Sequence, residues 1–411
     1  MNSRDRVKMA LNFEEPDRVP MDLGGTTTSG IMAHALDRLR DSLELEKRPV
    51  KVNEVLQMLG EVEMDVIDKL EVDILPVEPL VQFFGLKRER YKPWKLFDGT
   101  DVSVPGDFDV EVDDNGDFLL HREGDISQPV EGKMPKRGYY FDVPAWTESN
   151  LDFHPPKLED VARDFYQLKQ EELDFLARRA RQLRQQTDKA LVLCRWGAVG
   201  LPAVGSIPDF LCLLATDREY IKDLFELETT MSVTNLQKLW GSLGDDLDII
   251  ALEGYDFGSQ RSELFSPEWF EELYVPFFKK QNHWIHTHTT WKSWLHSCGS
   301  ITRILPMLIE SGLDIINPVQ CSAAGMEPIW LKENFGDKIV FWGGGVDTQK
   351  TFPFGTPAEV RDEVTKRIEI FAPGGGYIFN PVHNIQYGTP AENIIVAYQT
   401  AKTVGTYPIK D

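Results

Sequence analysis

Residues 292–300 read KSWLHSCGS, a short apolar stretch, Lys292–His296, that ends in a histidine and runs into a cysteine and a glycine. The pattern recurs on both sides of it, because short apolar stretches ending in Gly, Asp, Asn or His alternate with longer amphipathic ones. The expected strands are Arg18–Leu23, Val72–Val77, Ala190–Trp196, Leu247–Leu252, Lys292–His296, Leu313–Pro318, Lys338–Trp342 and Gly376–Asn380. Apolar strands separated by helices predict parallel strands that are buried on both faces.

Eight such units predict an α/β protein with a single (β/α)8 TIM barrel over residues 1–411. An open, doubly wound sheet is the alternative, since the strand count does not by itself prove closure. The intervening stretches fit helices. Ser266-Pro267, Thr356-Pro357 and Thr389-Pro390 each place a hydroxyl residue before a proline, which is typical of a helix with proline at its first position.

One segment, roughly residues 93–144, breaks this alternation between the second and third predicted strands. It alternates Val and Phe with Asp and Glu, and its pairs Asp98-Gly99 and Asn115-Gly116 are typical hairpin turns. We therefore expect a β-rich insertion within the barrel domain. A lid, a surface meander and the contact of a homodimer all remain compatible with this pattern.

Charge and cysteine content narrow the function. The 411 residues contain 44 Lys and Arg against 66 Asp and Glu, a net charge of −22, which argues against nucleic acid and membrane surfaces as partners and favours a small-molecule substrate. The apolar stretches are too short for a membrane helix and the N-terminal residues are charged, which predicts a cytoplasmic protein. The four cysteines are then core or ligand residues rather than disulfides.

Polar residues gather where the predicted strands end, and in a (β/α)8 barrel these ends surround one cavity. Apart from the pair in residues 292–300, we single out Arg195, Glu253, Tyr255, Asp256, Asn317, Gln320, His383, Asn384 and Gln386. Burying polar side chains at the ends of apolar strands costs free energy, so we interpret this set as functional.

His296 and Cys298 are the sharpest local signal, because two residues spaced in this way at a strand end can turn toward one point. Imidazole nitrogen and thiolate sulfur suit tetrahedral Zn²⁺. The candidates for a third ligand are His383, Cys321, Glu253 and Asp256, with His383 ranked first because it follows the last strand. The alternative is that Cys298 packs as a small apolar residue and His296 hydrogen-bonds a substrate.

Glu253 and Asp256 form a candidate carboxylate pair. One member could be kept protonated by its neighbour and serve as a general acid. The alternatives are that one of them orients His296, or that both complement a helix N-terminus.

Six blocks together resemble the uroporphyrinogen decarboxylase superfamily. They are RVKMALNFEEPDRVPMDLGG (6–25), LEGYDFGSQRSELFSPEWFEELYVPFFKKQ (252–281), WLHSCGSI (294–301), LDIINPVQ (313–320), FWGGGVDTQ (341–349) and GGYIFNPVHNIQYGTPAENI (375–394). The resemblance covers most of the chain outside the β-rich insertion and implies the same barrel fold. The true decarboxylases of this superfamily grip substrate carboxylates with an N-terminal arginine-rich block, whereas residues 22–36 here, DLGGTTTSGIMAHAL, contain no arginine.

The resemblance is therefore closer to the corrinoid-dependent methyltransferase branch. In its thiol-using members a His-x-Cys pair and a later cysteine bind zinc, which activates a thiol toward a methyl group on a corrinoid. His296 and Cys298 match the pair, while His383 stands where that later cysteine is expected. Other members use tetrahydrofolate as the methyl carrier, which requires an acid such as Glu253, Asp256 or Asn317 to polarise the pterin.

We thus expect a methyltransferase that moves a methyl group between a corrinoid protein and a small carrier, tetrahydrofolate or a thiol, in one-carbon metabolism. Glu253, Asp256 and Asn317 would carry the chemistry, and His296, Cys298 and His383 would hold zinc. The substrate-binding residues would be Arg195, Tyr255, Gln320, Asn384 and Gln386. The alternatives are a cofactor-free decarboxylase, with Arg195 or Arg261 as the carboxylate anchor, and a barrel that binds a small molecule without turnover.

Overall fold

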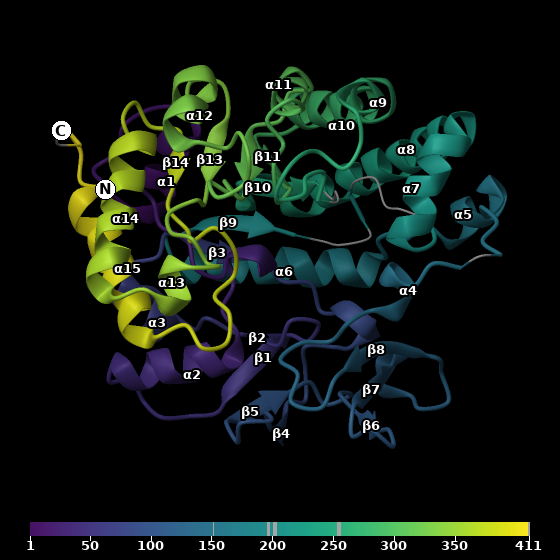
Figure 1. Cartoon of the computed structure of the whole chain (residues 1–411), viewed down its shortest axis with the longest axis horizontal. Coiled ribbons are helices and arrows are strands. Elements are labelled where there is room, and N and C mark those ends of the chain that lie inside the picture. The colour runs from purple at the N-terminus through teal and green to yellow at the C-terminus, as the bar shows by residue number, and fades with distance from the viewer. Residues whose placement is uncertain (151, 195–197, 200–203, 253–255, 410–411) are drawn as a thin grey trace.

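A computed structural model describes the whole chain except residues 151, 195–197, 200–203, 253–255 and 410–411. Its centre is a parallel sheet of seven strands in the order β14-β13-β12-β11-β10-β9-β3 (Figure 1). The strands are β3 (Ile74–Pro76), β9 (Ala190–Leu193), β10 (Ile249–Leu252), β11 (Lys292–His296), β12 (Ile315–Asn317), β13 (Val340–Trp342) and β14 (Tyr377–Ile378). Each lies within a predicted strand. A doubly wound sheet would reverse its order at a switch point, and this order runs one way throughout, so that alternative is wrong.

The first predicted strand, Arg18–Leu23, is not a regular strand but makes bonds to both edges of the sheet. The Phe379 N–H donates to the carbonyl of Pro20 (2.8 Å), and the Asp73 N–H donates to the carbonyl of Met21 (2.8 Å). Proline has no N–H to donate, and the Met21 N–H is taken by the Asp73 carboxylate (2.8 Å), so the ladder is interrupted here. The two edges of the sheet nevertheless reach one common segment.

Alternate residues of the strands face two different apolar layers. One layer consists of Ile74, Val192, Ile249, Trp294, Ile315, Val340 and Ile378, together with Val7 and Leu11 of α1 (Ser3–Leu11). The other layer, which contains Leu75, Leu191, Ile250, Leu295 and Phe341, packs against the surrounding helices. This alternation is that of a strand buried on both faces, and it explains why the strands have continuous apolar sequences.

Besides α1, the α-helices of the described chain are α2 (Ala33–Ser42), α3 (Met64–Leu70), α4 (Pro144–Thr147), α5 (Leu158–Asp164), α6 (Gln170–Gln186), α7 (Ile207–Thr216), α8 (Arg218–Leu243), α9 (Pro267–Trp269), α10 (Val275–His288), α11 (Leu305–Glu310), α12 (Pro328–Phe335), α13 (Thr351–Phe354), α14 (Pro357–Phe371) and α15 (Ala391–Val404). Helix α14 starts as predicted, with Thr356 accepting the Glu359 N–H. Helix α15 starts one residue later than predicted, because Pro390 is its N-cap. No helix in the described part of the chain is long and apolar enough to cross a membrane.

An aspartate stands immediately before three of the strands and ties each strand start to its neighbours. The carboxylate of Asp73, before β3, pairs with the guanidinium groups of Arg6 and Arg18, each at 2.7 Å. Asp248, before β10, accepts the Leu191 N–H (2.9 Å) and pairs with arginines from α1 and α6. The third, Asp314 before β12, accepts the Ser293 N–H (2.8 Å). Charged groups at this end of the sheet thus meet opposite charges or strand N–H groups.

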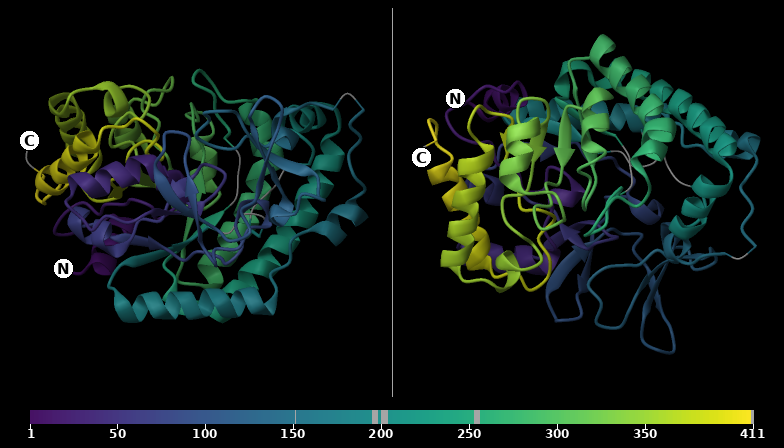
Figure 2. Two further views of the ribbon diagram at one scale, coloured as in Figure 1. Left: turned by 90° about the horizontal axis from the view of Figure 1, so that it is seen from below. Right: turned by 45° about the horizontal axis from the view of Figure 1, so that its top comes forward.

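Between β3 and β9, and just ahead of β3, the chain forms two small sheets, β2-β1-β5-β4 and β6-β7-β8. Their strands are β1 (Val50–Glu54), β2 (Leu59–Gly60), β4 (Lys92–Lys95), β5 (Asp101–Val104), β6 (Val110–Val112), β7 (Phe118–His121) and β8 (Val130–Met134). We call residues 50–60 and 92–142 the outer β region. Both views of Figure 2 show it on one side of the parallel sheet, away from the last helix α15. Neither β1 nor β2 was predicted from the sequence. Strand β2 pairs with β1, and the pairing of β1 with β5 joins distant segments.

Candidate metal centre

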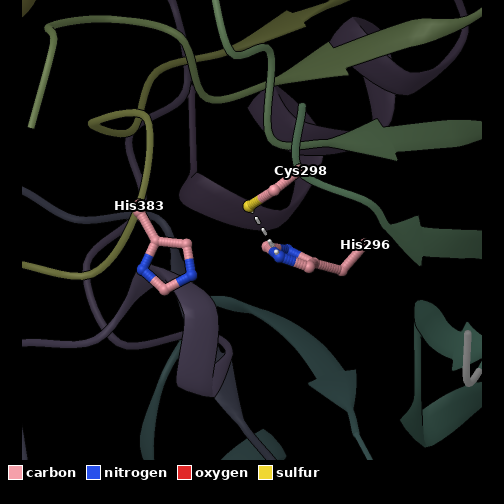
Figure 3. Close-up of side chains that lie close together, drawn as sticks. All are labelled: His296, Cys298 and His383. Carbon is pink, nitrogen blue, oxygen red and sulfur yellow. Dashed lines mark hydrogen bonds between the residues drawn. The ribbon is translucent and has the colours of Figure 1, made fainter. Parts of the chain in front are cut away.

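Three of the predicted ligands converge at the carboxyl ends of the strands. His296 is the last residue of β11, Cys298 lies in the loop after it, and His383 lies in the loop after β14. Figure 3 shows their side chains directed toward one space. The Cys298 Sγ lies 3.3 Å from His296 Nε2, and one ligand atom from each of the three residues lies within 4.8 Å of the others. The fold thus brings His296 and His383 together, although they lie far apart in the sequence.

The His296 ring is held in one tautomer by Asn317 at the end of β12. The side-chain Nδ2 of Asn317 donates to the backbone carbonyl of Trp342 (3.0 Å), which can only accept, so its Oδ1 must face the histidine. His296 Nδ1 is 2.7 Å from that oxygen and therefore carries the proton. Its Nε2 is left with a free lone pair, directed at Cys298. This is the arrangement that histidine ligands of metals adopt.

The His383 ring is held in the same way by its neighbour Asn384. His383 Nδ1 lies 2.9 Å from Asn384 Oδ1, while Asn384 Nδ2 donates to Gln57 Oε1 (2.7 Å) and to the carbonyl of Thr27 (3.4 Å). Asn384 is fully buried, and its Oδ1 also accepts a bond from Gln386. Two imidazoles that are far apart in the sequence therefore both present Nε2 to the same space.

The loop that carries Cys298 is fixed from three sides. Its backbone N–H donates to Asp256 Oδ1 (2.7 Å), and the next N–H, of Gly299, donates to the buried Gln320 Oε1 (2.7 Å). Gly299 has φ +87°, and a Cβ there would lie 2.4 Å from the backbone of Gly258, so only glycine fits. The close crossing of these two loops places the thiol beside His296.

Burial sets the protonation of the centre in the absence of a cation. Burial, with the nearby negative charge of Asp256, raises the pKa of the Cys298 thiol well above its ordinary range. Burial, with the adjacent ring of His296, lowers the pKa of His383 to about 4, so this ring is neutral at pH 7. Two imidazoles and one thiol that would lose its proton on binding are a donor set suited to Zn²⁺. Ligand atoms of tetrahedral zinc lie about 3.3–3.6 Å apart, which the 3.3 Å pair already meets.

The other predicted site residues support the metal centre, lie near it, or fall outside the described residues. Asn317 and Asn384 contact the two histidines, and Gln320 holds the loop of Cys298. Asp256 is half exposed, with Oδ1 3.7 Å from His296 Nε2. Cys321, an alternative third ligand, is hydrogen-bonded to the carbonyl of Val319 (3.4 Å). Arg195, Glu253 and Tyr255 lie outside the described residues.

Sequence reasoning missed one partner of the centre, Gln57. It lies in the turn between β1 and β2, a segment with no strand prediction. It has no local signal, since it acts on a residue about three hundred positions away in the sequence. Thr28, one of the polar residues that follow the first predicted strand, contacts the centre as well, because its Oγ1 donates to Asn317 Oδ1 (3.1 Å).

A cavity of about 1250 Å³ opens next to the loops that support the centre. Thr26 and Thr27 line it, and the Thr27 carbonyl is the group that accepts from Asn384. Its walls also include Glu54, Arg88 and Cys194, the last just after β9. Its lining is strongly charged, with Glu and Asp side chains beside a few arginines, and none of the three ligand residues is part of it.

Comparison with known proteins agrees with this description. The family model for uroporphyrinogen decarboxylase (URO-D) matches residues 206–404, which include the three converging side chains. The resemblance to the uroporphyrinogen decarboxylase superfamily is therefore confirmed. Within it, a methylated-thiol–coenzyme M methyltransferase of Methanosarcina mazei is 26% identical over 137 residues, 33% of each chain. The chain thus matches about a third of the length of this relative.

A solved structure, described as a methyltransferase from Methanosarcina mazei, superposes with a TM-score of 0.55 and covers 98% of both chains at 14% identity. At that identity the likeness concerns the fold. The α/β architecture with its curled parallel sheet is the fold of that protein.

Proposed function

We propose that the protein is a zinc-dependent methyltransferase that moves a methyl group between a corrinoid protein and a small carrier, on a closed (β/α)8 barrel. The observation that carries the proposal is the convergence of Cys298 Sγ with the Nε2 lone pairs of His296 and His383. The Methanosarcina mazei relative is a methylated-thiol–coenzyme M methyltransferase, and this supports a thiol as the carrier. Tetrahydrofolate is the other carrier compatible with the superfamily resemblance.

His296, Cys298 and His383 would hold the zinc ion, leaving one tetrahedral position for the carrier. When bound, zinc lowers the pKa of a thiol ligand and keeps it as a thiolate. A thiol carrier bound there would give up its S–H proton and would take the methyl group that the corrinoid of a partner protein would supply. Asp256, half exposed beside His296, is in position to take the released proton toward solvent.

The amides play a positioning role in this scheme. Asn317 and Asn384 keep the two Nε2 atoms unprotonated, so neither ring has to change tautomer when the ion binds. Arg195, Glu253 and Tyr255 remain our candidates for carrier binding and proton transfer. Gln320 and Gln386 remain candidates for orienting the carrier.

Elemental analysis of protein purified without a nickel resin tests the proposal. We expect about one zinc per chain in the wild type and almost none in His296→Ala or Cys298→Ala. Cys212→Ala, at an exposed cysteine of α7, is the matched control and should keep its zinc. Methylcobalamin should then be demethylated only in the presence of a thiol or tetrahydrofolate. A metal-free wild type, or release of CO₂ from an acid without metal or corrinoid, would refute the proposal.

A further inference from the structure

The loop after β14 that carries His383 has little regular structure of its own. Its backbone is bonded to the segment before α2, where the Ile385 N–H donates to the carbonyl of Gly30 and the Met32 N–H donates to the carbonyl of Ile385, both at 2.9 Å. These bonds place the main chain of the loop, but they leave the His383 ring to be fixed by side chains.

The first such side chain is Gln57, from the outer β region. Its Oε1 accepts one hydrogen of Asn384 Nδ2, and Asn384 Oδ1 in turn accepts the Nδ1 proton of His383. The other acceptor of Asn384 Nδ2, the Thr27 carbonyl, lies at a long 3.4 Å. Gln57 Oε1, at 2.7 Å, is thus the nearer of the two acceptors of Nδ2, and together with Gln386, which donates to Asn384 Oδ1, it fixes which way the buried amide points.

Gln57 is itself anchored. The carboxyl group of Glu54, only 3% exposed, accepts the N–H groups of both Leu56 and Gln57 at 2.8 Å. The Leu56 carbonyl accepts the Phe141 N–H (2.8 Å), which joins this turn to the segment after β8. The turn between β1 and β2 is thus part of a hydrogen-bonded unit with the rest of the outer β region.

A second, independent contact joins the same two parts of the molecule. The ring of Tyr139, in the segment after β8, stacks on Tyr387 with centroids 4.2 Å apart and planes at 23°. Phe97 packs against both rings, and Arg38 of α2 lies over Tyr387 at 5.3 Å. Tyr387 is four residues after His383, so the stack holds the far side of the histidine loop.

From these contacts we infer that the outer β region is a structural part of the metal centre: Gln57 and the Tyr139–Tyr387 stack are positioning elements that set the direction and tautomer of His383. The inference rests on the proposed function for the identity of the ion, but the tautomer of His383 exists without any ion. The region accordingly serves as a scaffold for a ligand, in addition to any role as a lid or an interface.

Two measurements on the full-length protein test this inference. Long-range ¹H–¹⁵N spectra of protein labelled at histidine, assigned for His383 with His383→Gln, should show the Nδ1–H tautomer in the metal-free wild type. Gln57→Leu, which removes the acceptor, should give a mixture of tautomers, and Gln57→Glu, which keeps an acceptor oxygen, should restore the wild-type signal. Gln128→Ala, at an exposed glutamine of the same region, is the control.

Zinc affinity, measured by competition with a chelator, should fall about tenfold in Gln57→Leu and also in Tyr139→Ala, but not in Gln57→Glu or Gln128→Ala. An unchanged His383 tautomer together with unchanged zinc affinity in Gln57→Leu would overturn the inference. A wild type that binds no zinc but shows the expected tautomer changes would instead overturn the proposed function and leave the positioning role standing.

Discussion

The two ends of the parallel sheet solve different problems with different chemistry. At the amino ends of the strands, Asp73 and Asp248 are buried with arginines and strand N–H groups. At the carboxyl ends, His296, His383 and Cys298 are supported by neutral amides that leave their ligand atoms free. In (β/α)8 barrels, the fold that we propose for this chain, the first end carries stability and the second carries chemistry. A substitution should therefore damage one property and spare the other, according to the end at which it lies.

The largest effect should come from Asp73→Ala. The substitution leaves the guanidinium groups of Arg6 and Arg18 and the Met21 N–H without their shared acceptor, all of them buried. Loss of one partner of a buried ion pair costs about 3–5 kcal/mol of unfolding free energy. Urea denaturation should show this loss while zinc content per folded chain stays unchanged. Asp101→Ala, which removes an exposed pair with Lys95, should cost about 0–1 kcal/mol, and an equal loss in both variants would contradict the comparison.

The next effect concerns a buried carboxyl group that, unlike those at the amino ends, has no cation in direct contact. Burial raises the pKa of Glu54 from 4.5 to about 7, with Arg88 and Glu78 as the charged groups that face it. Below pH 4.5 the group is protonated in both states. As the pH rises toward 7 the unfolded chain releases the proton and the folded chain keeps it, so stability falls and then levels off.

This difference corresponds to about 3 kcal/mol between pH 4.5 and pH 7.5. Denaturation curves over that range should show it in the wild type, and Glu54→Gln should flatten this part of the pH profile even if it lowers stability throughout. A profile of the same slope in Glu54→Gln would mean that another group is responsible.

The smallest effect separates support from ligation at the carboxyl ends. Asn317→Ala removes the acceptor of the His296 Nδ1 proton but leaves all three ligand atoms in place. Loss of such an outer partner lowers metal affinity about 10–100-fold. Zinc competition should show this decrease, with Asn334→Ala, at an amide exposed on α12, as the control. Complete loss of zinc would make Asn317 a ligand in its own right.

The strands of the parallel sheet were predicted better than the contacts that support the metal centre. Seven of the eight expected strands are present because each is a continuous apolar run that only a doubly covered sheet can bury. The segment with Pro20 was overestimated as a strand, since its missing N–H and the side chain of Asp73 interrupt the ladder. The grouping of His296, Cys298 and His383 followed from the convergence of strand ends.

What the sequence did not reveal is the support of that group. The acceptor roles of Asn317 and Asn384 depend on carbonyl groups of Trp342 and Thr27, which every residue type possesses. Gln57 reaches Asn384 only because β1 pairs with β5 in the outer β region. Contacts of this kind carry no residue pattern, so local sequence reasoning had nothing to detect.

The aspartates that stand just before β3, β10 and β12 have a broader consequence. Each carboxylate accepts an N–H from an adjacent segment, so together the three aspartates link strand starts to their neighbours at the end of the sheet opposite the ligands. These bonds hold the strand starts in register independently of the loops at the carboxyl ends. The loops at the carboxyl ends of the strands, and the molecules recognised there, can therefore change in evolution while the bonds that hold the sheet together are kept.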